Sequence, residues 1–542
     1  MKKIGNTGSF KKFYLNDQIY VDKTEYIYNL INNEARVFIS RPRRFGKSLT
    51  LDTIATLFET GVEPYFKGTW IYDKWTEPTY PVFRLSFLNL DNSSLDLFKK
   101  QLNSIISEFA IKISVKGYVE KTEPEDSILS LLEKLEEETR QIVILIDEYD
   151  YQLTSNINHD DLYKQFQQKI KRFYANIKDK FAIKFLGITG VTRLKDVAIF
   201  SVGSDINDIT NDSAYSQMIG FTRDEIKKYY IDYLTLAASY ENNCRVDKVT
   251  DTQIESMLDR LAKNYDGYCF DEFYKKKVFS TWSVNSFFQS IVENKFVFFD
   301  EYWYDNGGLP SILVDYLKTH ELNIFEYLDK DKFLKVSSDD FKNPTALTTI
   351  NQNVLMCQTG YLTLRSDLKK SSTVLLGIPN GEIYKALNRL LANNIFKGKA
   401  DVTDDQGKNL LEEGTVDDII NLFNRALNSV SYDNYPIVSE SSVQNMLKLY
   451  LLGAHQEVLS EVHEAKGRAD LIVNTDIRRI VFEFKYAQNE SEAKTKLSEA
   501  VEQIKSRDYG NILPKKHELL RIAAVFNADP KVRAFTENQI VP

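Results

Sequence analysis

The chain has 542 residues, which is too long for a single hydrophobic core and by length predicts about three or four domains. Its 22 glycines and 12 prolines fall well below average usage, a composition that argues against long disordered linkers, and its hydrophobic content of 43% supplies material for packed cores. The net charge of −8 excludes a global attraction to polyanions, so any nucleic-acid binding has to come from local basic patches.

Cysteine usage and the N-terminus indicate a soluble cytoplasmic protein. Cys244, Cys269 and Cys357 are far apart and form no C-x-x-C pair, which argues against a zinc site and against a disulfide framework. The first residues are basic but no apolar segment follows them, so no signal peptide is expected. No apolar run approaches the roughly 20 residues that cross a bilayer. We therefore expect a reducing, cytoplasmic compartment and no membrane partner.

The first functional pattern is a strand, a loop and a helix near the N-terminus. A β-branched strand at residues 35–40 leads into Arg41-Pro42-Arg43-Arg44-Phe45-Gly46-Lys47-Ser48, and apolar residues at helical spacing follow over residues 49–58. In this Walker A context the loop N–H groups and the helix N-terminus hold phosphates, Lys47 reaches the β and γ phosphates, and the Ser48 hydroxyl binds Mg²⁺. The pattern predicts a site for ATP and Mg²⁺ formed by Arg44, Gly46, Lys47 and Ser48.

The first half of this loop departs from the Walker A pattern. Arg41 stands where the first glycine belongs, and Pro42, Arg43 and Arg44 make the loop stiff and basic. These side chains are compatible with phosphate binding, while the pattern leaves the geometry of the loop open.

A second strand ends in two acids. Residues 142–146 are five buried-type residues, and Asp147 and Glu148 follow them. A central parallel strand would deliver both carboxylates to the carboxyl edge of the sheet, where ligands bind. We expect Asp147 to hold Mg²⁺ through water and Glu148 to polarise the water that attacks the γ-phosphate. Such a run alone is usually a core strand that meets solvent, but its combination with Gly46-Lys47-Ser48 favours a nucleotide site.

Two further segments fit the same parallel sheet. Residues 80–87 and 181–188 are strand-like, with helical patterns between them, as βαβ architecture requires. Thr189 follows the second strand and is the candidate sensor of the γ-phosphate. Arg193 either stabilises phosphoryl charge or pairs with an acidic side chain as a structural residue, and the sequence leaves both open.

The middle of the chain, residues 221–430, carries no catalytic cluster. Thr222 caps a helix with an acid-rich first turn, which predicts the helical lid of an ATPase. The aromatic side chains of residues 264–268 are expected to pack rather than to stack on bases. A hairpin of residues 361–364 and 373–379 next to helical patterns predicts a winged-helix-like region.

The second functional pattern is a pair of short strands near the C-terminus. Residues 467–473 and 480–485 flank a polar, turn-forming stretch, which predicts a β-hairpin. Side chains alternate along a strand, so Glu483 and Lys485 point the same way while the phenylalanines beside them point into the core. Asp470 on the preceding strand joins them at one edge of a small sheet. Two carboxylates can hold Mg²⁺ and a lysine beside them can orient or deprotonate water, which together would cut a phosphodiester.

A polar edge on an amphipathic hairpin is the alternative interpretation of this pattern. An E-x-K triple alone arises by chance about once or twice in a chain of this length. The nucleotide pattern in the same chain is the context that favours a catalytic site.

Several segments support a resemblance to a known family. They are Tyr20-Val21-Asp22-Lys23-Thr24, Arg41 to Ser48, Asp147-Glu148-Tyr149-Asp150, Ile188-Thr189-Gly190-Val191-Thr192-Arg193, Gly220-Phe221-Thr222, Asn264-Tyr265-Asp266-Gly267-Tyr268, Gln358-Thr359-Gly360-Tyr361-Leu362-Thr363, Ile378-Pro379-Asn380, and Asp470 with Glu483-Phe484-Lys485. Over nearly its full length the chain resembles a prokaryotic family that joins an AAA-ATPase-like domain to a C-terminal PD-(D/E)XK nuclease domain. An arginine-rich loop is usual for that family, and the proline of the nuclease motif is absent here. The resemblance implies that Glu461 completes the metal shell and that Gln503 contacts the nuclease site.

These patterns together predict an α/β multidomain protein. We expect a P-loop NTPase domain with a parallel sheet over residues 1–220, a helical lid over 221–345, a winged-helix-like region and connector over 346–430, and a restriction-endonuclease-like α/β domain over 431–542.

The leading functional hypothesis is a Mg²⁺-dependent nuclease that ATP gates or powers. Its partners would be ATP and nucleic acid, DNA in the first instance, and the oligomeric state stays open, with a homo-oligomer among the possibilities. The alternative is a nucleotide-binding switch or scaffold whose C-terminal domain binds nucleic acid or protein without cutting it.

Overall fold

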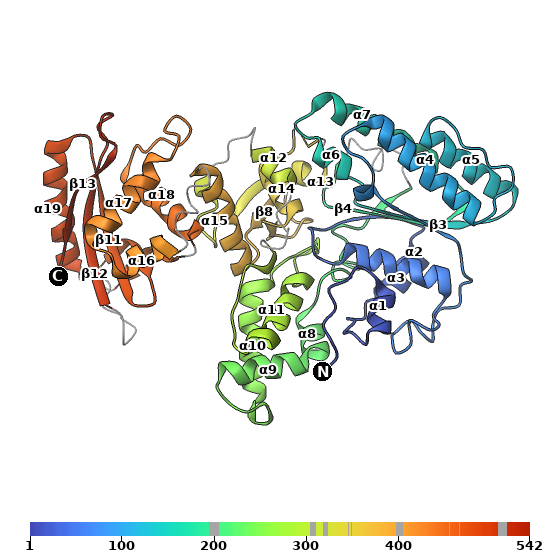
Figure 1. Cartoon of the computed structure of the whole chain (residues 1–542), viewed down its shortest axis with the longest axis horizontal. Coiled ribbons are helices and arrows are strands. Elements are labelled where there is room, and N and C mark those ends of the chain that lie inside the picture. Colours follow the sequence, from blue (N-terminus) through green and yellow to red (C-terminus); the bar gives the residue numbers. More distant parts are fainter. Residues whose placement is uncertain are drawn as a thin grey trace. The chain divides into compact units, whose positions relative to one another are not determined.

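The computed structural model of the chain (Figure 1) describes all residues except 195–204, 304–310, 318–323, 345, 348, 397–404, 455, 465–466 and 508–517, and except the side chains of 311, 314, 317, 405, 406, 457, 460–464, 467 and 468. The chain forms two compact units. One comprises residues 1–320 and 333–383, and the other comprises residues 321–332 and 384–542. Among the described residues, no helix has both the length and the apolar character that crossing a membrane requires.

The first unit is built on a five-stranded parallel sheet of order β2-β3-β4-β1-β5. Its strands are β1 (Arg36–Ser40), β2 (Val82–Ser86), β3 (Ile142–Asp147), β4 (Ile183–Gly190) and β5 (Asn207–Asp208). Residues 142–146 of β3 are all buried, as a central strand that is covered on both faces requires. This sheet confirms the predicted P-loop type of fold.

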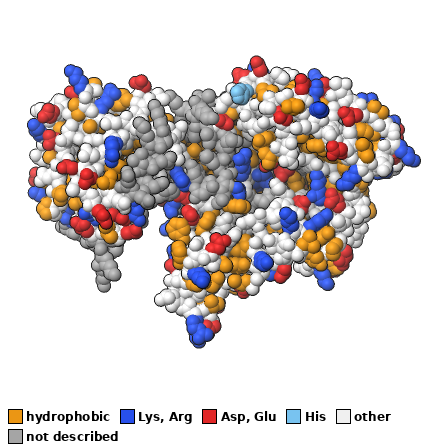
Figure 2. Space-filling view, viewed as in Figure 1, with side chains coloured by type: hydrophobic (Ala, Val, Ile, Leu, Met, Phe, Trp, Pro, Cys, Tyr) orange, Lys and Arg blue, Asp and Glu red, His pale blue; other side chains and the backbone are white. Residues whose placement is uncertain are grey.

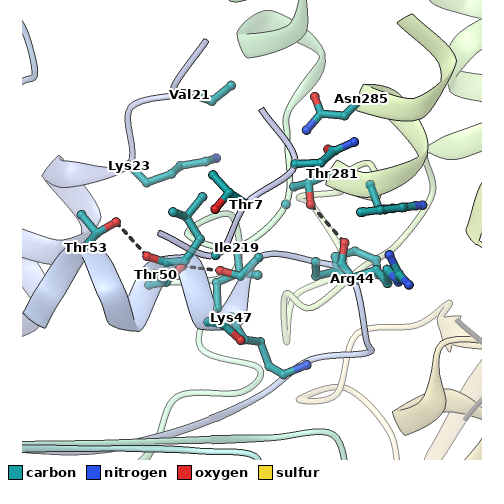
Figure 3. Close-up of a pocket in the computed structure, with 18 of the residues that line it drawn as sticks. Thr7, Val21, Lys23, Arg44, Lys47, Thr50, Thr53, Ile219, Thr281 and Asn285 are labelled. Carbon is teal, nitrogen blue, oxygen red and sulfur yellow. Dashed lines mark hydrogen bonds between the residues drawn. The ribbon is translucent and has the colours of Figure 1, made fainter. Parts of the chain in front are cut away.

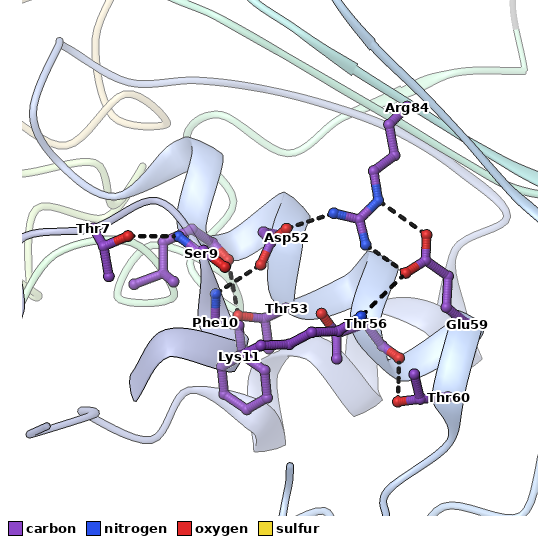
Figure 4. Close-up of polar contacts among 11 residues, drawn as sticks. Thr7, Ser9, Phe10, Lys11, Asp52, Thr53, Thr56, Glu59, Thr60 and Arg84 are labelled. Atoms are coloured by element: carbon purple, nitrogen blue, oxygen red, sulfur yellow. Dashed lines mark hydrogen bonds and ion pairs between the residues drawn. The ribbon is translucent and has the colours of Figure 1, made fainter. Parts of the chain in front are cut away.

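Helices cover both faces of this sheet. Figure 1 shows α1 (Phe10–Leu15), α2 (Thr24–Asn33) and α3 (Lys47–Thr60) on one side, and α4 (Leu95–Lys112), α5 (Pro124–Glu137) and α7 (Asp160–Ile177) on the other, with α6 (Tyr151–Ser155) after β3. The N-terminal segment is tied to α3, because Phe10 N–H donates to Asp52 at 2.6 Å (Figure 4).

Two of the segments that follow the strands are fixed to each other. The buried Asp150 carboxylate accepts hydrogen bonds from the N–H groups of Val191 and Thr192. A Cβ on Gly190 would lie 2.4 Å from the Tyr149 ring, so only glycine fits there. The turn after β4 is therefore locked against the turn after β3, and the carboxyl ends of these strands stay together.

The region predicted as the helical lid, residues 221–345, begins with α8 (Arg223–Tyr229), α9 (Ile231–Glu241), α10 (Asp251–Tyr265) and α11 (Thr281–Asn294), and shorter elements follow. Thr222 is the N-cap of α8 and forms a complete capping box with Glu225. Tyr265 and Tyr268 are buried, which confirms that they pack rather than face solvent. Gly267 has a φ of 98° and lies against the Pro379 carbonyl. The turn at residues 264–268 therefore contacts the segment at residues 378–380.

A small sheet of order β6-β8-β7 completes the first unit. It contains β6 (Leu334–Ser337), β7 (Thr363–Leu364) and β8 (Thr373–Gly377), with α12 (Ser311–Leu317), α13 (Ser338–Lys342) and α14 (Gln352–Thr359) nearby in the chain. The antiparallel pairing of β7 with β8 confirms the hairpin that was predicted from residues 361–364 and 373–379. The strand β6 was not predicted. Short 3-10 helices lie at Phe87–Asn89, Val246–Lys248 and Ile324–Glu326.

The second unit contains a five-stranded mixed sheet of order β13-β12-β11-β10-β9. Its strands are β9 (Glu457–Glu464), β10 (Gly467–Asn474), β11 (Arg478–Ala487), β12 (Glu518–Asn527) and β13 (Ala534–Ile540). β11 and β12 are parallel and all other neighbours are antiparallel, so α19 (Glu490–Arg507) forms the crossover between them. The β10–β11 hairpin was predicted correctly.

Helices pack on both faces of the second sheet. Ala500 and Ile504 of α19 pack with Val481 on one face. On the other face, Phe423 of α17 (Val416–Asn428) contacts Phe482, whose ring centroid lies 5.3 Å away. The unit also contains most of α15 (Gly381–Ile395), α16 (Asp405–Glu413) and α18 (Glu440–Gly453). On the visible face of each unit, lysine and arginine side chains are interspersed with acidic ones (Figure 2).

Candidate functional site

A cavity of about 500 Å³ lies beside the loop that joins β1 to α3 (Figure 3). Gly46, the N-cap of α3, has φ 104°, a conformation that favours glycine. Lys47 begins α3, so the helix N-terminus and the loop N–H groups lie at the cavity wall. This is the arrangement that binds phosphate.

The Lys47 ammonium is held within its own loop. It donates to the carbonyls of Arg41 at 2.9 Å and Pro42 at 3.0 Å, and its side chain is buried. Burial lowers the pKa of Lys47, and Asp147 is the acid that opposes this shift most strongly. A buried cation whose partners are two neutral carbonyls is well placed to meet an incoming phosphate.

The carboxyl ends of β3 and β4 bring three oxygen groups together. Asp147 accepts a hydrogen bond from Ser48 Oγ at 2.5 Å, and the Thr189 hydroxyl donates to the other Asp147 oxygen. A carboxylate with an adjacent hydroxyl is a donor set that suits Mg²⁺, which usually keeps several waters and takes one or two protein carboxylates. The residues predicted to hold this ion therefore meet at one point.

Glu148 lies at the wall of the same cavity. Its φ of 53° is left-handed, and its N–H donates to Asp147 at 3.0 Å. Burial and then the neighbouring Asp147 raise the pKa of Glu148. A carboxylate with a raised pKa is a better acceptor for a proton from water, as the predicted role requires.

Two arginines that the sequence placed near this site point elsewhere. The Arg41 guanidinium is buried, donates to the carbonyls of Ser40 and Thr210, and lies 4.1 Å from the Phe270 ring centroid. Burial lowers the pKa of Arg41 to about 9. Arg193 forms an ion pair with Asp208 and does not line the cavity. The structure thus favours the structural alternative for Arg193.

The other end of the cavity is mostly apolar, and sequence patterns did not identify it. Its lining residues include Phe13, Ile19, Val21, Ile27, Ile219, Phe221 and Tyr230. They come from the N-terminal segment and from the start of the lid, which are about 200 residues apart, so no local spacing connects them. An apolar chamber next to a phosphate-binding loop has the form of a nucleotide site.

The second candidate site lies where β10 and β11 separate. The register pairs Leu471 with Phe482, so Asp470 and Glu483 follow opposite each other. Asp470 accepts the N–H of Phe484 at 2.8 Å. Lys485 Nζ lies 2.9 Å from a Glu483 oxygen and donates to the Phe484 carbonyl at 3.0 Å. The three residues predicted from the sequence are therefore in one place.

Glu483 is buried and Asp470 is half-buried, contrary to the solvent-facing edge that a polar hairpin would present. Glu483 is 0% exposed, and its second carboxylate oxygen has no hydrogen-bond partner among the described residues. Burial and then Asp470 raise the pKa of Glu483 to about 7. Burial also raises the pKa of Asp470. For Lys485, burial lowers the pKa, but Glu483, Glu440 and Asp470 together outweigh this effect, so the pKa is raised.

The donor set fits a hard cation. An unpartnered buried oxygen of Glu483 next to Asp470 costs free energy unless a cation or water satisfies it. Among the described side chains, no group of three or more histidine, cysteine or carboxylate residues is placed to hold a metal. Two carboxylates suffice for Mg²⁺, which retains water ligands.

Two residues of α18 complete the surroundings of this site, and sequence analysis missed them. Glu440 lies 3.5 Å from Lys485 Nζ, and the Gln444 side chain is close enough to Asp470 to lower the pKa of that carboxyl. They are four residues apart on one helix face, a spacing that could have drawn attention to them. The side chain of Glu461 lies outside the described part of the structure. Gln503 is half-buried on α19, and its role stays a prediction.

Comparisons with known proteins identify a family model for each of the two domains that carry these sites. Residues 4–200 match the family model described as Predicted AAA-ATPase, and residues 438–535 match the model of the PD-(D/E)XK nuclease superfamily. An uncharacterized protein in the vnfD 5'region of Azotobacter chroococcum mcd 1 is 26% identical over 528 residues, covering 95% of this chain and 94% of that protein.

Among solved structures, the crystal structure of Cdc6p from Pyrobaculum aerophilum aligns with 12% identity and a TM-score of 0.24, over 72% of this chain and 99% of that chain. This score is too low to bear on the fold. The two family matches confirm the resemblance found in the sequence: the chain joins a predicted AAA-ATPase domain to a C-terminal domain of the PD-(D/E)XK nuclease superfamily.

Proposed function

We propose that the chain binds and hydrolyses ATP at its N-terminal site and cleaves phosphodiester bonds of nucleic acid at its C-terminal site, with Mg²⁺ at both. The observation that carries the nuclease assignment is the buried Glu483 with an unpartnered oxygen, beside Asp470 and Lys485. A module that only bound nucleic acid would have no chemical need for this costly arrangement.

At the N-terminal site, the Lys47 ammonium would leave its two carbonyl partners for the phosphates. Glu148 would orient a water and accept its proton as the water oxygen attacks the terminal phosphorus. Ser48 and Asp147 would hold Mg²⁺, which neutralises phosphate charge when bound.

At the C-terminal site, Asp470 and Glu483 would hold Mg²⁺, which stabilises the charge on the attacked phosphate when bound. The Lys485 ammonium, anchored by Glu483 and the Phe484 carbonyl, would orient the attacking water. Glu440 lies 3.5 Å from Lys485 Nζ and would help to keep the lysine charged and in position.

The test uses the full chain with supercoiled plasmid, single-stranded DNA and RNA in the presence of Mg²⁺, with and without ATP. We expect cleavage by the wild type that Asp470→Ala abolishes, and loss of nucleotide binding by calorimetry in Lys47→Ala. Substrates left intact by the wild type, or cut equally by Asp470→Ala, would refute the nuclease assignment. Nucleotide binding without any cleavage would favour the switch or scaffold alternative.

If ATP gates cleavage, Lys47→Ala should lose the ATP-dependent part of the activity and keep the metal site intact. Lys112→Ala is the matched control, because it removes the same positive charge from an exposed lysine at the end of α4, which does not line the cavity. Equal cleavage by wild type and Lys47→Ala at every ATP concentration would exclude gating.

A further inference from the structure

The phosphate-binding loop carries two arginines that form no ion pair with a carboxylate of the described residues. Arg43 and Arg44 both line the cavity. Other arginines of this unit are held by acids: Arg84 is held by Asp52 and Glu59 (Figure 4), and Arg193 is paired with Asp208. The guanidinium groups of Arg43 and Arg44 are thus available to an anion in the cavity, which Glu148 also lines.

Arg44 is held in one place by the lid. Its guanidinium lies 3.9 Å from the ring centroid of Trp282, at the start of α11, and its carbonyl accepts from Thr281 Oγ at 3.0 Å (Figure 3). The Trp282 ring is fixed in turn, because its Nε1 donates to the Tyr302 carbonyl at 3.1 Å. The contact with an aromatic face positions the cation but provides no counter-charge.

Arg44 has a left-handed backbone, with a φ of 70°, which is uncommon for a non-glycine residue. Burial, and then repulsion from Arg43, lower the pKa of Arg44. A bound anion would oppose this shift, because an opposite charge beside the guanidinium favours its charged form.

We propose that Arg44 contacts the terminal phosphoryl group of the bound nucleotide and stabilises its charge during hydrolysis, so that the chain supplies its catalytic arginine in cis, with Trp282 as the positioning residue. This inference rests on the proposed ATP hydrolysis. In that reaction a bond forms between the water oxygen and the terminal phosphorus, and the bond from this phosphorus to the bridging oxygen breaks. ADP leaves with the electron pair, and the proton of the water goes to Glu148.

A cis arginine has a consequence for assembly. A site that borrows its arginine from a neighbouring copy works only in an oligomer, so its rate per chain rises with protein concentration. Here all the residues of the proposed reaction come from one chain, so the rate per chain should not depend on concentration.

The experiment measures single-turnover ATP hydrolysis, and ATP and ADP affinity, for wild type, Arg44→Gln, Trp282→Leu and the control Arg172→Ala, which removes an exposed arginine of α7. We expect Arg44→Gln to lower hydrolysis by about 10³-fold, the usual weight of such an arginine. Its ADP affinity should stay within about threefold of wild type while its ATP affinity falls, since only ATP has the terminal phosphate. Trp282→Leu should show a smaller loss of hydrolysis with unchanged ADP affinity, and Trp282→Phe should restore part of it.

Mixing Arg44→Gln with Lys47→Ala tests whether the arginine acts in trans. Each variant lacks one part of the site, so restored hydrolysis in the mixture, or a wild-type rate per chain that rises with concentration, would overturn the proposal. Wild-type hydrolysis by Arg44→Gln would overturn it as well.

A wild type that binds ATP but does not hydrolyse it would refute the proposed ATPase activity alone. In that case the ATP-to-ADP affinity ratio of Arg44→Gln still decides whether Arg44 contacts the terminal phosphate, and an unchanged ratio would overturn the contact.

Discussion

Replacing Glu483 by glutamine should change how the stability of the C-terminal sheet depends on pH. The side chain is completely buried and its pKa is raised to about 7 by burial and by Asp470, from an ordinary value of 4.5. The folded protein therefore holds this proton more tightly than the unfolded chain does. Stability contributed by the protonated group is present at low pH and is lost as the pH rises from 4.5 to about 7.

The magnitude follows from these two pKa values. Linkage for one group gives a loss of roughly 2.5 kcal/mol in the wild type between pH 5 and pH 8, as an upper limit because the site can hydrate. Glutamine does not titrate, so the variant should lack this loss. Comparing the change between the two pH values, rather than the stability at one pH, cancels the separate effect of removing the Lys485 ion pair.

Hydrogen exchange of the β10 and β11 amides, followed by mass spectrometry on the full chain with a chelator, reads the opening free energy of this sheet. After correction for intrinsic exchange, the wild type should lose protection between pH 5 and pH 8 while Glu483→Gln should not. Mg²⁺ at pH 8 should restore protection to the wild type only. An equal pH dependence in both proteins would refute the assignment of the raised pKa to Glu483.

The remaining predictions concern both sites and the core. Because Glu483 must lose its proton to bind Mg²⁺, the rate of plasmid cleavage should rise about tenfold per pH unit below pH 7 and level off above it. The midpoint of this pH profile should move to lower pH as the Mg²⁺ concentration is increased. A pH profile unaffected by Mg²⁺ would contradict this prediction. Ser48→Ala removes the hydroxyl that meets Asp147, so single-turnover ATP hydrolysis should fall at least about 10²-fold while ADP still binds by calorimetry. Glu440→Gln should lower plasmid cleavage about 10-fold to 100-fold and leave ATP hydrolysis at the wild-type rate, since Glu440 lies 3.5 Å from Lys485 Nζ and does not line the nucleotide cavity. Gly190→Ala should destabilise the first unit by about 1–3 kcal/mol in urea unfolding, because its Cβ would overlap the Tyr149 ring, and a change below 0.5 kcal/mol would show that the turn adapts.

Local patterns were sufficient to predict the parts of each site that lie at strand ends. A run of buried residues precedes Asp147, and apolar and polar residues alternate around Glu483. Each pattern predicts a strand and its direction from six to ten neighbouring residues. The predicted roles of Asp147 and Glu483 follow from their positions on these strands, because ligands bind at the carboxyl ends of strands in an open α/β sheet. For these residues the sequence contains almost all of the structural information.

Parts assembled from distant segments were not predictable in the same way. Glu440 lies 45 residues before Lys485, on a helix whose apolar spacing indicated only core packing, and its contact depends on how α18 packs on β11. The strands β9, β12 and β13 were also missed, because their pairing is set by the sheet rather than by their own composition. Burial of Glu483 has the same origin, since it depends on helices that cover both faces of that sheet.

The phosphate-binding loop is completed by residues that the ribosome makes much later. Arg41 is held by Thr210 and Phe270, the carbonyls of Arg43 and Arg44 by Trp303 and Thr281, and Pro42 packs against Gly360. During synthesis, more than 300 residues after the loop must therefore be made before all of these contacts can form. A fragment that ends at residue 220, although it contains every residue of the Walker-type patterns, should leave this loop unsupported and bind nucleotide poorly.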